Sequence, residues 1–376
     1  MKIGLPKEIK TGENRVGLAP EGAAELTRNG HTVIIESSAG AASGFPDLEY
    51  AQAGAKIAEN ASQVWEGSEM VIKVKEPLES EFKYLREGLI LFTYLHLAAE
   101  EKVAKTLLDK KAIGIAYETV ELDDGSKPML RPMSEVAGRM AVQIGMHYLE
   151  RTNGGSGKLL SGVTGVNPGV VTVIGSGVAG MNAARIAHGI GAQVIVVGII
   201  EEQLKRAASL LPGIKTLHST AENIAAAVAS SDLVIGSVAV TGASAPKLVT
   251  RQMVSRMRPG SVIVDISIDQ GGCFETSRPT THAAPVYKEE GVTHYCVTNM
   301  PGAVPNTSTT ALTKATLPYA LKIANEGLAA LQDEYIAKGV NTFLGKLTNK
   351  QVAEALKMEY EPLQTAIPLA RYRELC

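Results

Sequence analysis

The chain has 376 residues, of which 45% are hydrophobic and 20% are charged, so it is long enough for two or three domains and apolar enough to bury whole sheets. Its formal net charge of -2 provides no basic field that would attract nucleic acid or an anionic membrane. We therefore expect a soluble protein without nucleic-acid or membrane partners.

The ends and the cysteines of the chain indicate a cytoplasmic protein with reduced thiols. Residues 1–6 lack the apolar core of a signal peptide. The apolar stretch at 89–99 is interrupted by polar side chains and is too short to cross a bilayer. Cys273, Cys296 and Cys376 have no metal-like spacing and leave one cysteine unpaired in any disulfide scheme, so we expect no metal site.

The first third of the chain alternates short apolar strands with helical segments, which indicates a mostly parallel sheet covered by helices. We predict strands at 2–5, 32–35, 70–74, 89–92 and 112–116, and helices at 21–28 and 100–110. A longer amphipathic helix is predicted from Ser134 to about Arg151, because a serine with Glu135 close behind suits a helix start.

A loop predicted at 152–157 precedes a second alternating series. We predict strands at 170–174, 194–197, 214–217, 233–235, 262–264 and 294–297, with a helix at 181–190. After Pro305 the pattern becomes helical, with helices predicted at 311–326 and 328–338. Because a helical tail has few partners of its own, we expect it to pack back on the first domain.

The predicted fold class is α/β, with two doubly wound, Rossmann-like parallel-sheet domains. A discontinuous substrate and catalytic domain would comprise residues 1–130 and 305–376. A dinucleotide-binding domain would comprise residues 131–304.

The most specific motif is the G-x-G-x-x-G run at 175–180, directly behind the predicted strand at 170–174. A lone run of this kind is more often a plain turn, but here a strand precedes it and a helix follows. Gly175 permits a tight turn, Gly177 lets the main chain approach a pyrophosphate, and Gly180 lets helix and strand pack closely. The helix N-terminus then aims its N–H groups at the phosphates, so the motif predicts dinucleotide binding.

Four polar residues stand beyond predicted strand ends or in a nearby loop, where open parallel sheets bind ligands. Lys75, His96 and Asp269 follow three predicted strands, and Arg15 lies in a polar loop before Pro20. Each alone has an ordinary structural interpretation as a satisfied or solvated side chain. Together they supply two cations for a carboxylate, an imidazole for proton transfer and an acid beside the nucleotide domain. An amino-acid or keto-acid oxidoreductase needs this set.

Around these residues the chain resembles the family of alanine dehydrogenase and the nicotinamide-binding subunit of proton-translocating transhydrogenase. The matching stretches run in order up to about Glu361, whereas residues 364–376 match nothing specific. They are Gly4-Leu5-Pro6-Lys7-Glu8, Glu13-Asn14-Arg15-Val16, Val74-Lys75-Glu76-Pro77, Tyr94-Leu95-His96, Met133-Ser134-Glu135-Val136-Ala137-Gly138-Arg139, the glycine run, Val264-Asp265-Ile266, Asp269-Gln270-Gly271-Gly272 and Asn299-Met300-Pro301.

The resemblance implies reversible oxidative deamination of L-alanine to pyruvate and ammonia with a nicotinamide cofactor, by a homohexamer. It implies that Arg15 and Lys75 bind the substrate carboxylate, that His96 transfers the proton, and that Asp269 orients the amine or the attacking water. The implied cofactor contacts, besides the three glycines, are Ser134, Val178, Ala179, Ser219, Val238, Ala239, Ile266, Ser267, Ile268, Asp269, Arg278, Val297, Thr298, Asn299 and Met300. Several of these, such as Val238 and Val297, also have an ordinary interpretation as core residues at strand ends.

One position of the cofactor site departs from the pattern of NAD-binding folds. The predicted strand at 194–197 should end in an acid that accepts from the ribose 2′-hydroxyl and repels a 2′-phosphate, but it is followed by Gly198. We therefore predict a weakened preference for NAD and tolerance of NADP, with Lys205 and Arg206 near enough in sequence to meet a 2′-phosphate. The alternative is that Glu201 takes over the role of the acid.

Three other functions fit parts of the sequence. A transhydrogenase-like subunit would bind the cofactor and pass hydride to a partner protein without deaminating a substrate. A saccharopine-forming relative would use lysine and 2-oxoglutarate, and a nucleotide sensor would have no activity. The lack of a spanning segment and the joint presence of Arg15, Lys75 and His96 favour the amino-acid dehydrogenase.

Overall fold

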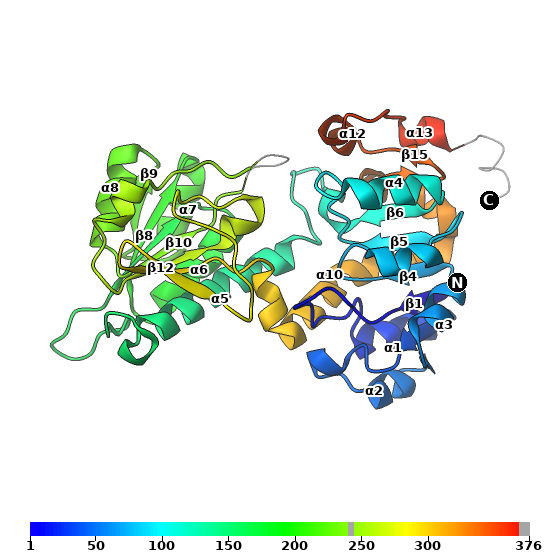
Figure 1. Cartoon of the computed structure of the whole chain (residues 1–376), viewed down its shortest axis with the longest axis horizontal. Helices are drawn as coiled ribbons and strands as arrows, with labels where there is room; N and C mark the ends of the chain where they lie inside the picture. The colour runs from blue at the N-terminus through cyan, green and yellow to red at the C-terminus, as the bar shows by residue number, and fades with distance from the viewer. Residues whose placement is uncertain (240–243, 368–376) are drawn as a thin grey trace. The chain divides into compact units, whose positions relative to one another are not determined.

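The structure is a computed structural model that describes residues 1–239 and 244–367 (Figure 1). The chain forms two compact units, the first made of Met1–Met133 with Gly302–Cys376 and the second of Ser134–Pro301. Each unit is built on one mostly parallel sheet with helices on its faces. The predicted α/β fold class with two Rossmann-like domains is therefore confirmed.

The sheet of the first unit has the strand order β15-β14-β6-β5-β4-β1-β2-β3. The strands from β6 to β3 are parallel, whereas β14 and β15 add an antiparallel edge. The order reverses between β1 and β4, as in doubly wound folds. The strands are β1 (Lys2–Leu5), β2 (Thr32–Glu36), β3 (Lys56–Ala58), β4 (Met70–Ile72), β5 (Ile90–Thr93), β6 (Ile113–Ala116), β14 (Val340–Phe343) and β15 (Lys346–Leu347).

The core of the first unit joins the two ends of the chain. Strands β4, β5 and β6 are buried along their whole length, as expected of parallel strands covered on both faces. Leu347 and Val352 pack into one apolar cluster with Trp65, Leu91 and Leu107, so the C-terminal segment completes this unit. Its helices are α1 (Pro20–Arg28), α2 (Asp47–Gln52), α3 (Ala61–Glu66), α4 (Glu101–Asp109), α10 (Pro305–Glu326), α11 (Glu334–Gly339), α12 (Lys350–Leu356) and α13 (Leu363–Ala366).

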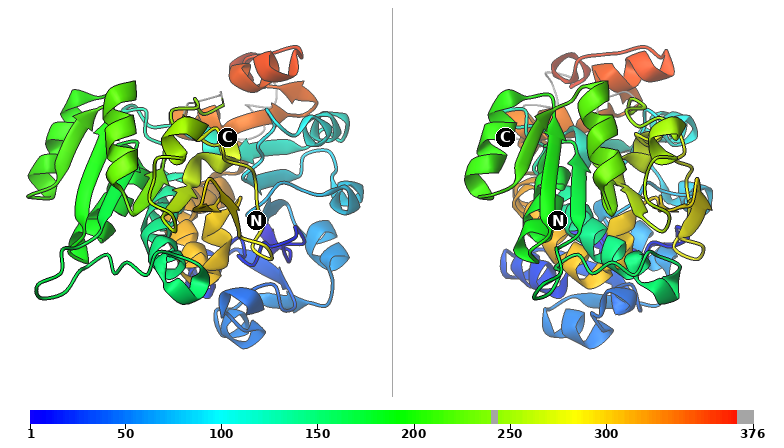
Figure 2. Two further views of the ribbon diagram at one scale, coloured as in Figure 1. Left: turned by 60° about the vertical axis from the view of Figure 1, so that its left-hand side comes forward. Right: turned by 90° about the vertical axis from the view of Figure 1, so that its left-hand side faces the viewer.

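The sheet of the second unit has the order β12-β13-β11-β10-β7-β8-β9, with only β12 antiparallel to its neighbour. Its order reverses between β7 and β10, and Figure 2 shows its strands side by side with helices on both faces. The strands are β7 (Val170–Ile174), β8 (Gln193–Gly198), β9 (Lys215–His218), β10 (Leu233–Gly236), β11 (Val262–Asp265), β12 (Val286–Glu289) and β13 (Val292–Tyr295). The helices of this unit are α5 (Arg131–Leu149), whose first turn crosses the unit boundary, α6 (Val178–Gly189), α7 (Glu201–Leu210), α8 (Ala221–Ser230) and α9 (Arg251–Val254).

The turn from β7 into α6 requires glycine at two positions. Gly175 has a φ of 106°, and a Cβ there would lie 2.6 Å from the carbonyl oxygen of Ser237. A Cβ on Gly180 would lie 1.9 Å from the carbonyl oxygen of Gly175. The first turn of α6 therefore packs directly on the end of β7, as the motif predicted.

Several predicted element limits are wrong. Helix α5 begins at Arg131 rather than at Ser134, because Pro132 is tolerated in a first turn, where its missing N–H is not needed. The helix predicted at 328–338 is divided at Asp333, whose carboxylate accepts from the N–H groups of Tyr335 and Ile336 and so begins α11 there. Strands β3, β12, β14 and β15 were not predicted.

Other sequence expectations concern membranes, metals and thiols. Within residues 1–239 and 244–367, no helix is long and apolar enough to cross a lipid bilayer. The same residues contain no cluster of histidine, cysteine and carboxylate side chains suited to a metal ion. Cys273 and Cys296 are buried free thiols, and Cys376 lies outside the described residues.

We predict that Gly180→Ala lowers the free energy of unfolding by about 1–3 kcal/mol, because the added methyl group overlaps a main-chain carbonyl. Gly189→Ala in the same helix is the control, since a Cβ there meets nothing within 4 Å. That control should be neutral or stabilising by up to about 1 kcal/mol, the helix propensity gain of alanine over glycine. Urea unfolding followed by circular dichroism measures both. Equal stabilities of the two variants would contradict the close packing.

Candidate functional site

The candidate substrate residues lie beyond the carboxyl ends of three adjacent strands in the first unit. Arg15 is in the loop after β1, Lys75 follows β4, and His96 follows β5. These strands flank the point where the strand order reverses, and open parallel sheets bind ligands beside that point. A Cβ on Gly17 would lie 2.6 Å from the carbonyl oxygen of Ile72, so the Arg15 loop runs directly against the end of β4.

Arg15 is paired with a carboxylate two residues away. Its side chain is 2% exposed, and its Nε and Nη2 donate to the two oxygens of Glu13 at 2.7 and 2.5 Å. The main-chain N–H of Arg15 also donates to Glu13 Oε1 at 3.0 Å. Burial opposes ionisation of Glu13, but the hydrogen bonds and charge of Arg15, together with the charge of Lys75, outweigh it and lower the pKa of Glu13 to about 2. The structure thus brings Arg15 and Lys75 into one electrostatic cluster.

Helix α10 fixes the loop that carries Arg15. The hydroxyl of Thr309 accepts from the N–H of Val16 at 3.3 Å, and that of Thr313 accepts from the N–H of Ala19 at 2.8 Å. Both threonines are buried. Their hydroxyl oxygens are the acceptors for loop N–H groups that have no partner in a strand or helix. The position of Arg15 therefore depends on residues nearly 300 positions later.

The end of β4 is held by a buried ion cluster. Lys73 is 1% exposed, and its Nζ lies 3.2 Å from Glu8 Oε2 and 2.8 Å from Glu81 Oε1. Glu8 Oε1 accepts from the N–H groups of Val74 at 2.5 Å and of Lys75 at 3.2 Å. Burial raises the pKa of Glu8, although the charge of Lys73 opposes that rise. The cluster fixes the main chain at Lys75 and leaves its side chain partly exposed.

His96 is exposed and has an unusual main-chain conformation. Its φ is 50°, in the left-handed region that few residues other than glycine adopt. Its ring stacks on that of Tyr94, with centroids 5.8 Å apart and an angle of 9° between the planes. The buried Tyr94 donates to the carbonyl oxygen of Met129 at 2.6 Å. Burial raises the pKa of Tyr94 and the charge of Arg15 opposes that rise, so the guanidinium lies near the ring on which His96 stacks.

The glycine run in the second unit has the features of an anion site. Gly177 is the N-cap of α6, and no side chain caps that end, so the N–H groups of the first turn are available to a ligand. A Cβ on Gly177 would meet nothing within 4 Å, and Val178 beside it is 40% exposed. A dinucleotide pyrophosphate fits such a helix terminus, because main-chain N–H groups and the helix dipole both favour negative charge.

Helices α5 and α6 cross near three of the cofactor candidates, Ser134 on α5 and Val178 and Ala179 on α6. A Cβ on Gly138 would lie 2.1 Å from the carbonyl oxygen of Ala179, so the two helices are in direct contact there. Ser134 precedes Gly138 by one helical turn and shares its face of α5. The structure therefore places Ser134 on the side of α5 that faces the start of α6.

Gly198 ends strand β8, and side chains of neighbouring residues occupy the space where a Cβ on it would lie. Its carbonyl oxygen accepts from the N–H of Ser219 at 2.9 Å. A Cβ on Gly198 would lie 2.6 Å from Ser176 Oγ and 3.1 Å from Leu204 Cδ2. Ser176 Oγ donates to Gln203 Oε1 at 2.7 Å, so this serine–glutamine pair lies next to the strand end where an acid was expected.

Asp265 organises the segment that carries Asp269. Its Oδ1 accepts from the N–H of Ser267 at 3.0 Å, and its Oδ2 accepts from the N–H of Cys273 at 3.0 Å and from the hydroxyl of Ser277 at 2.6 Å. Burial raises the pKa of Asp265, although these hydrogen bonds oppose the rise. Asp269 itself is exposed, as its proposed role requires.

The remaining cofactor candidates also follow strands of the second unit. Val238 and Ala239 follow β10, and Ile266, Ser267 and Ile268 follow β11. The candidates after β13 are Val297, Thr298, Asn299 and Met300. The N–H of Asn299 donates to Asp269 Oδ1 at 3.4 Å. Arg278 lies 3.9 Å from the ring centroid of Tyr287 and stacks on it.

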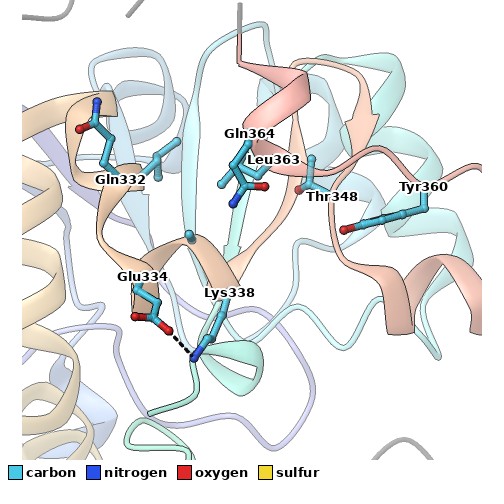
Figure 3. Close-up of a pocket in the computed structure, with 9 residues that line it drawn as sticks. Gln332, Glu334, Lys338, Thr348, Tyr360, Leu363 and Gln364 are labelled. Atoms are coloured by element: carbon cyan, nitrogen blue, oxygen red, sulfur yellow. Dashed lines mark ion pairs between the residues drawn. The ribbon is translucent and has the colours of Figure 1, made fainter. Parts of the chain in front are cut away.

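The structure therefore gathers the candidates into two groups, one at the carboxyl edge of each sheet. Arg15, Lys75 and His96 form the group of the first unit, and the glycine run, Gly198 and Asp269 belong to that of the second unit. A surface pocket of about 730 Å³ lies elsewhere in the first unit and is lined mainly by residues of α11, of the helical turn before it and of α13 (Figure 3). It contains none of the candidates, and its Glu334–Lys338 ion pair is an ordinary helical one, so we assign it no role.

Several supporting residues escaped the sequence analysis. Glu8, Glu13 and Asp265 lie inside the stretches that carry the family resemblance, but nothing in their spacing shows that their carboxylates bind main-chain N–H groups. Thr309 lies outside those stretches, and so does Glu118, whose Oε1 accepts from the N–H of His96 at 2.6 Å. Their contacts join segments that are distant in the chain, and no local pattern reveals them.

Comparisons with known proteins agree over nearly the whole chain. Two family models match, "Alanine dehydrogenase/PNT, N-terminal domain" over residues 4–137 and "Alanine dehydrogenase/PNT, C-terminal domain" over residues 141–350. Alanine dehydrogenase 2 of Staphylococcus aureus (strain Mu50 / ATCC 700699) is 54% identical over 373 residues, which is 98% of this chain and 100% of the relative. A solved structure of an L-alanine dehydrogenase matches with a TM-score of 0.92 and 49% identity, covering 95% of this chain and 99% of that one. A solved transhydrogenase from Sinorhizobium meliloti shares the fold. It matches with a TM-score of 0.82 and 24% identity, covering 93% of this chain and 99% of that one.

The low pKa of Glu13 predicts a specific dependence of stability on acid. A carboxyl with a folded pKa of about 2 and an ordinary value of 4.5 stabilises the fold above pH 4.5, and this contribution is lost as the pH falls toward 2. The shift corresponds to about 3 kcal/mol. Unfolding of wild type and Glu13→Gln between pH 7 and pH 2 should show a steeper loss of stability in the wild type.

The control for this experiment is Glu25→Gln, which breaks the exposed pair with Arg28. It should change the free energy of unfolding by less than about 1 kcal/mol at any pH. Parallel stability curves for wild type and Glu13→Gln would show that the Glu13–Arg15 pair has no such role.

Proposed function

Because the chain belongs to the alanine dehydrogenase/PNT family, we propose that it catalyses the reversible, nicotinamide-dependent oxidative deamination of L-alanine. In the balanced reaction, L-alanine, oxidised cofactor and water give pyruvate, ammonium, reduced cofactor and a proton. The observation that carries the proposal is 54% identity over 98% of the chain to a protein named alanine dehydrogenase. The candidate residues at the carboxyl edges of the sheets supply the side chains that this chemistry needs.

In this proposal the first unit binds the substrate and the second binds the dinucleotide. Arg15 and Lys75 bind the substrate carboxylate, since two fixed cations neutralise it and a planar guanidinium orients it. Glu13 supports this role because it fixes the guanidinium plane through two hydrogen bonds. A nicotinamide cofactor held by the residues at the carboxyl edge of the second sheet would supply the hydride chemistry at the substrate Cα.

His96 is the proposed proton-transfer residue. An imidazole changes charge near neutral pH, so it can take a proton from the substrate amine or water and return it in the reverse reaction. Its exposure at the end of β5 and its position beside the Arg15 and Lys75 cluster support this assignment. Asp269 orients the amine or the attacking water, and its exposed carboxylate on a segment held by Asp265 supports that role.

The proposed cofactor contacts are the residues at the carboxyl edge of the second sheet. The uncapped N-terminus of α6 would hold the pyrophosphate, and the open space at Gly177 supports its close approach. We also propose tolerance of NADP, because Gly198 offers neither an acceptor for a ribose 2′-hydroxyl nor a charge that repels a 2′-phosphate. A homohexamer in the cytoplasm is proposed on family likeness.

We predict that the protein oxidises NADH only when pyruvate and ammonium are both present, and that His96→Ala lowers kcat at least about 100-fold. Binding of NADH, measured by fluorescence, should be unchanged in this variant. His31→Ala is a matched control, because His31 precedes β2 at the opposite edge of the same sheet and bonds to Asn325. Its kcat should stay within about twofold of wild type, a change below about 0.5 kcal/mol.

Three outcomes of that assay would contradict the proposal. If neither NADH nor NADPH is consumed in the presence of pyruvate and ammonium, a transhydrogenase-like binding subunit is favoured. Consumption with lysine and 2-oxoglutarate in place of ammonium and pyruvate would favour a saccharopine-type enzyme. Full activity of His96→Ala would remove His96 from the mechanism.

We predict that Gly198→Asp shifts the ratio of kcat/KM values for NADH and NADPH toward NADH by about tenfold or more, since one added charged hydrogen bond is worth about 1.5–3 kcal/mol. A Cβ at this position meets Ser176 Oγ, so the shift should be larger when Ser176→Ala is present as well. Glu201→Gln is the control for the alternative that Glu201 binds the ribose. An unchanged ratio in the aspartate variants, or a large loss of NADH use in Glu201→Gln, would contradict the role of Gly198.

A further inference from the structure

We propose that Glu118 is a positioning residue for His96: its carboxylate holds the main chain of His96 in the left-handed conformation and so sets the direction of the imidazole. The inference rests on the proposed role of His96 in proton transfer. It concerns a residue outside the stretches that carry the family resemblance, and it assigns Glu118 no contact with the substrate.

The main chain at His96 is held in a conformation that it would not adopt unaided. A left-handed φ costs a residue with a side chain about 1–2 kcal/mol, so surrounding contacts must supply this energy. The conformation also has a direct geometric effect. Since φ determines how Cβ leaves the main chain, a return to an ordinary φ would turn the imidazole away from its present direction.

Glu118 supplies the contacts on the N–H side. Its Oε1 accepts from the N–H of His96 at 2.6 Å, and its two oxygens lie 3.2 and 3.3 Å from the N of Leu95. Strand β5 ends at Thr93, so the N–H groups of residues 95 and 96 lie beyond its ladder and need other acceptors. A carboxylate is a strong acceptor for such groups, because the hydrogen bond is charge-assisted.

The contacts on the carbonyl side complete the turn. The carbonyl oxygen of His96 accepts from the N–H groups of Ala99 at 2.9 Å and Glu100 at 3.1 Å, just before α4 begins. The imidazole makes no hydrogen bond to Glu118, whose oxygens bind the main chain. The carboxylate therefore acts on the orientation of His96 rather than on its ring directly.

Glu118 comes from the strand next to His96. It lies in the short helical turn after β6, and β6 pairs with β5. The same arrangement occurs elsewhere in this unit, where Glu8 accepts from the N–H of Lys75 and Glu13 from the N–H of Arg15. All three proposed substrate-side residues thus have a carboxylate bound to their own main-chain N–H.

The decisive comparison is among Glu118→Ala, Glu118→Gln and Glu118→Asp in the full-length protein. The alanine variant removes the acceptor, and we expect kcat to fall about 10- to 100-fold, because a small misplacement of a reacting group has effects of this size. The KM values for alanine and pyruvate should stay within about twofold of wild type, since Arg15 and Lys75 are unchanged. The glutamine variant keeps a carbonyl oxygen at the same reach and should recover most of the lost kcat.

The aspartate variant separates reach from charge. It keeps the charge but shortens the side chain by one methylene, so its kcat should lie below that of the glutamine variant. This comparison also decides the matter if Glu118→Ala does not fold. Glu69→Ala is the matched control, because Glu69 accepts from the N–H of Lys2 at 2.7 Å at the opposite edge of the same sheet. It should leave kcat and KM within about twofold of wild type, a change below about 0.5 kcal/mol.

Two results would overturn the inference. One is a kcat within twofold of wild type in Glu118→Ala, and the other is an aspartate variant more active than the glutamine variant. Activity of His96→Ala distinguishes this failure from failure of the proposed function. If His96→Ala is inactive while Glu118→Ala is fully active, only the positioning role is wrong; if His96→Ala keeps wild-type activity, the proposed function of His96 is wrong.

Discussion

Carboxylates at the ends of parallel strands hold the main chain that carries the candidate residues. Where a strand ends, the next N–H groups lose their ladder partners and need other acceptors. Glu8 supplies one at Lys75, Glu118 at His96, and Asp265 at the turn before Asp269. Glu8 and Asp265 are buried, and their burial is tolerated because each carboxylate is satisfied by N–H groups, a hydroxyl or a buried cation. Exposed side chains can therefore stand on a fixed main chain.

The sequence was sufficient for features that depend on local pattern. Apolar runs of strand length alternate with amphipathic segments, and this alternation predicted both parallel sheets. The glycine run at 175–180 predicted the turn from β7 into α6, where a Cβ on Gly175 or Gly180 would overlap a main-chain carbonyl oxygen. The position of polar residues after predicted strands indicated that Lys75 and His96 lie at the carboxyl edge of one sheet.

Features that depend on distant partners could not be predicted in the same way. Strand β14 pairs with β6 from the other end of the chain, so its strand character comes from tertiary pairing and not from a local signal. The ion pair of Arg15 lies within two residues, yet its burial depends on the fold around it. The left-handed φ of His96 is likewise invisible in the sequence, because Glu118 stabilises it across two strands.

The second unit interrupts the first along the chain, and this has a consequence for synthesis. A growing chain can close the inserted sheet while the outer unit still lacks β14 and the apolar side chains of Leu347 and Val352. Until the last segment has left the ribosome, β6 is an open edge and the hydrophobic centre beneath α4 is partly uncovered. The inserted unit is thus the first to become complete, and the N-terminal part of the chain matures last.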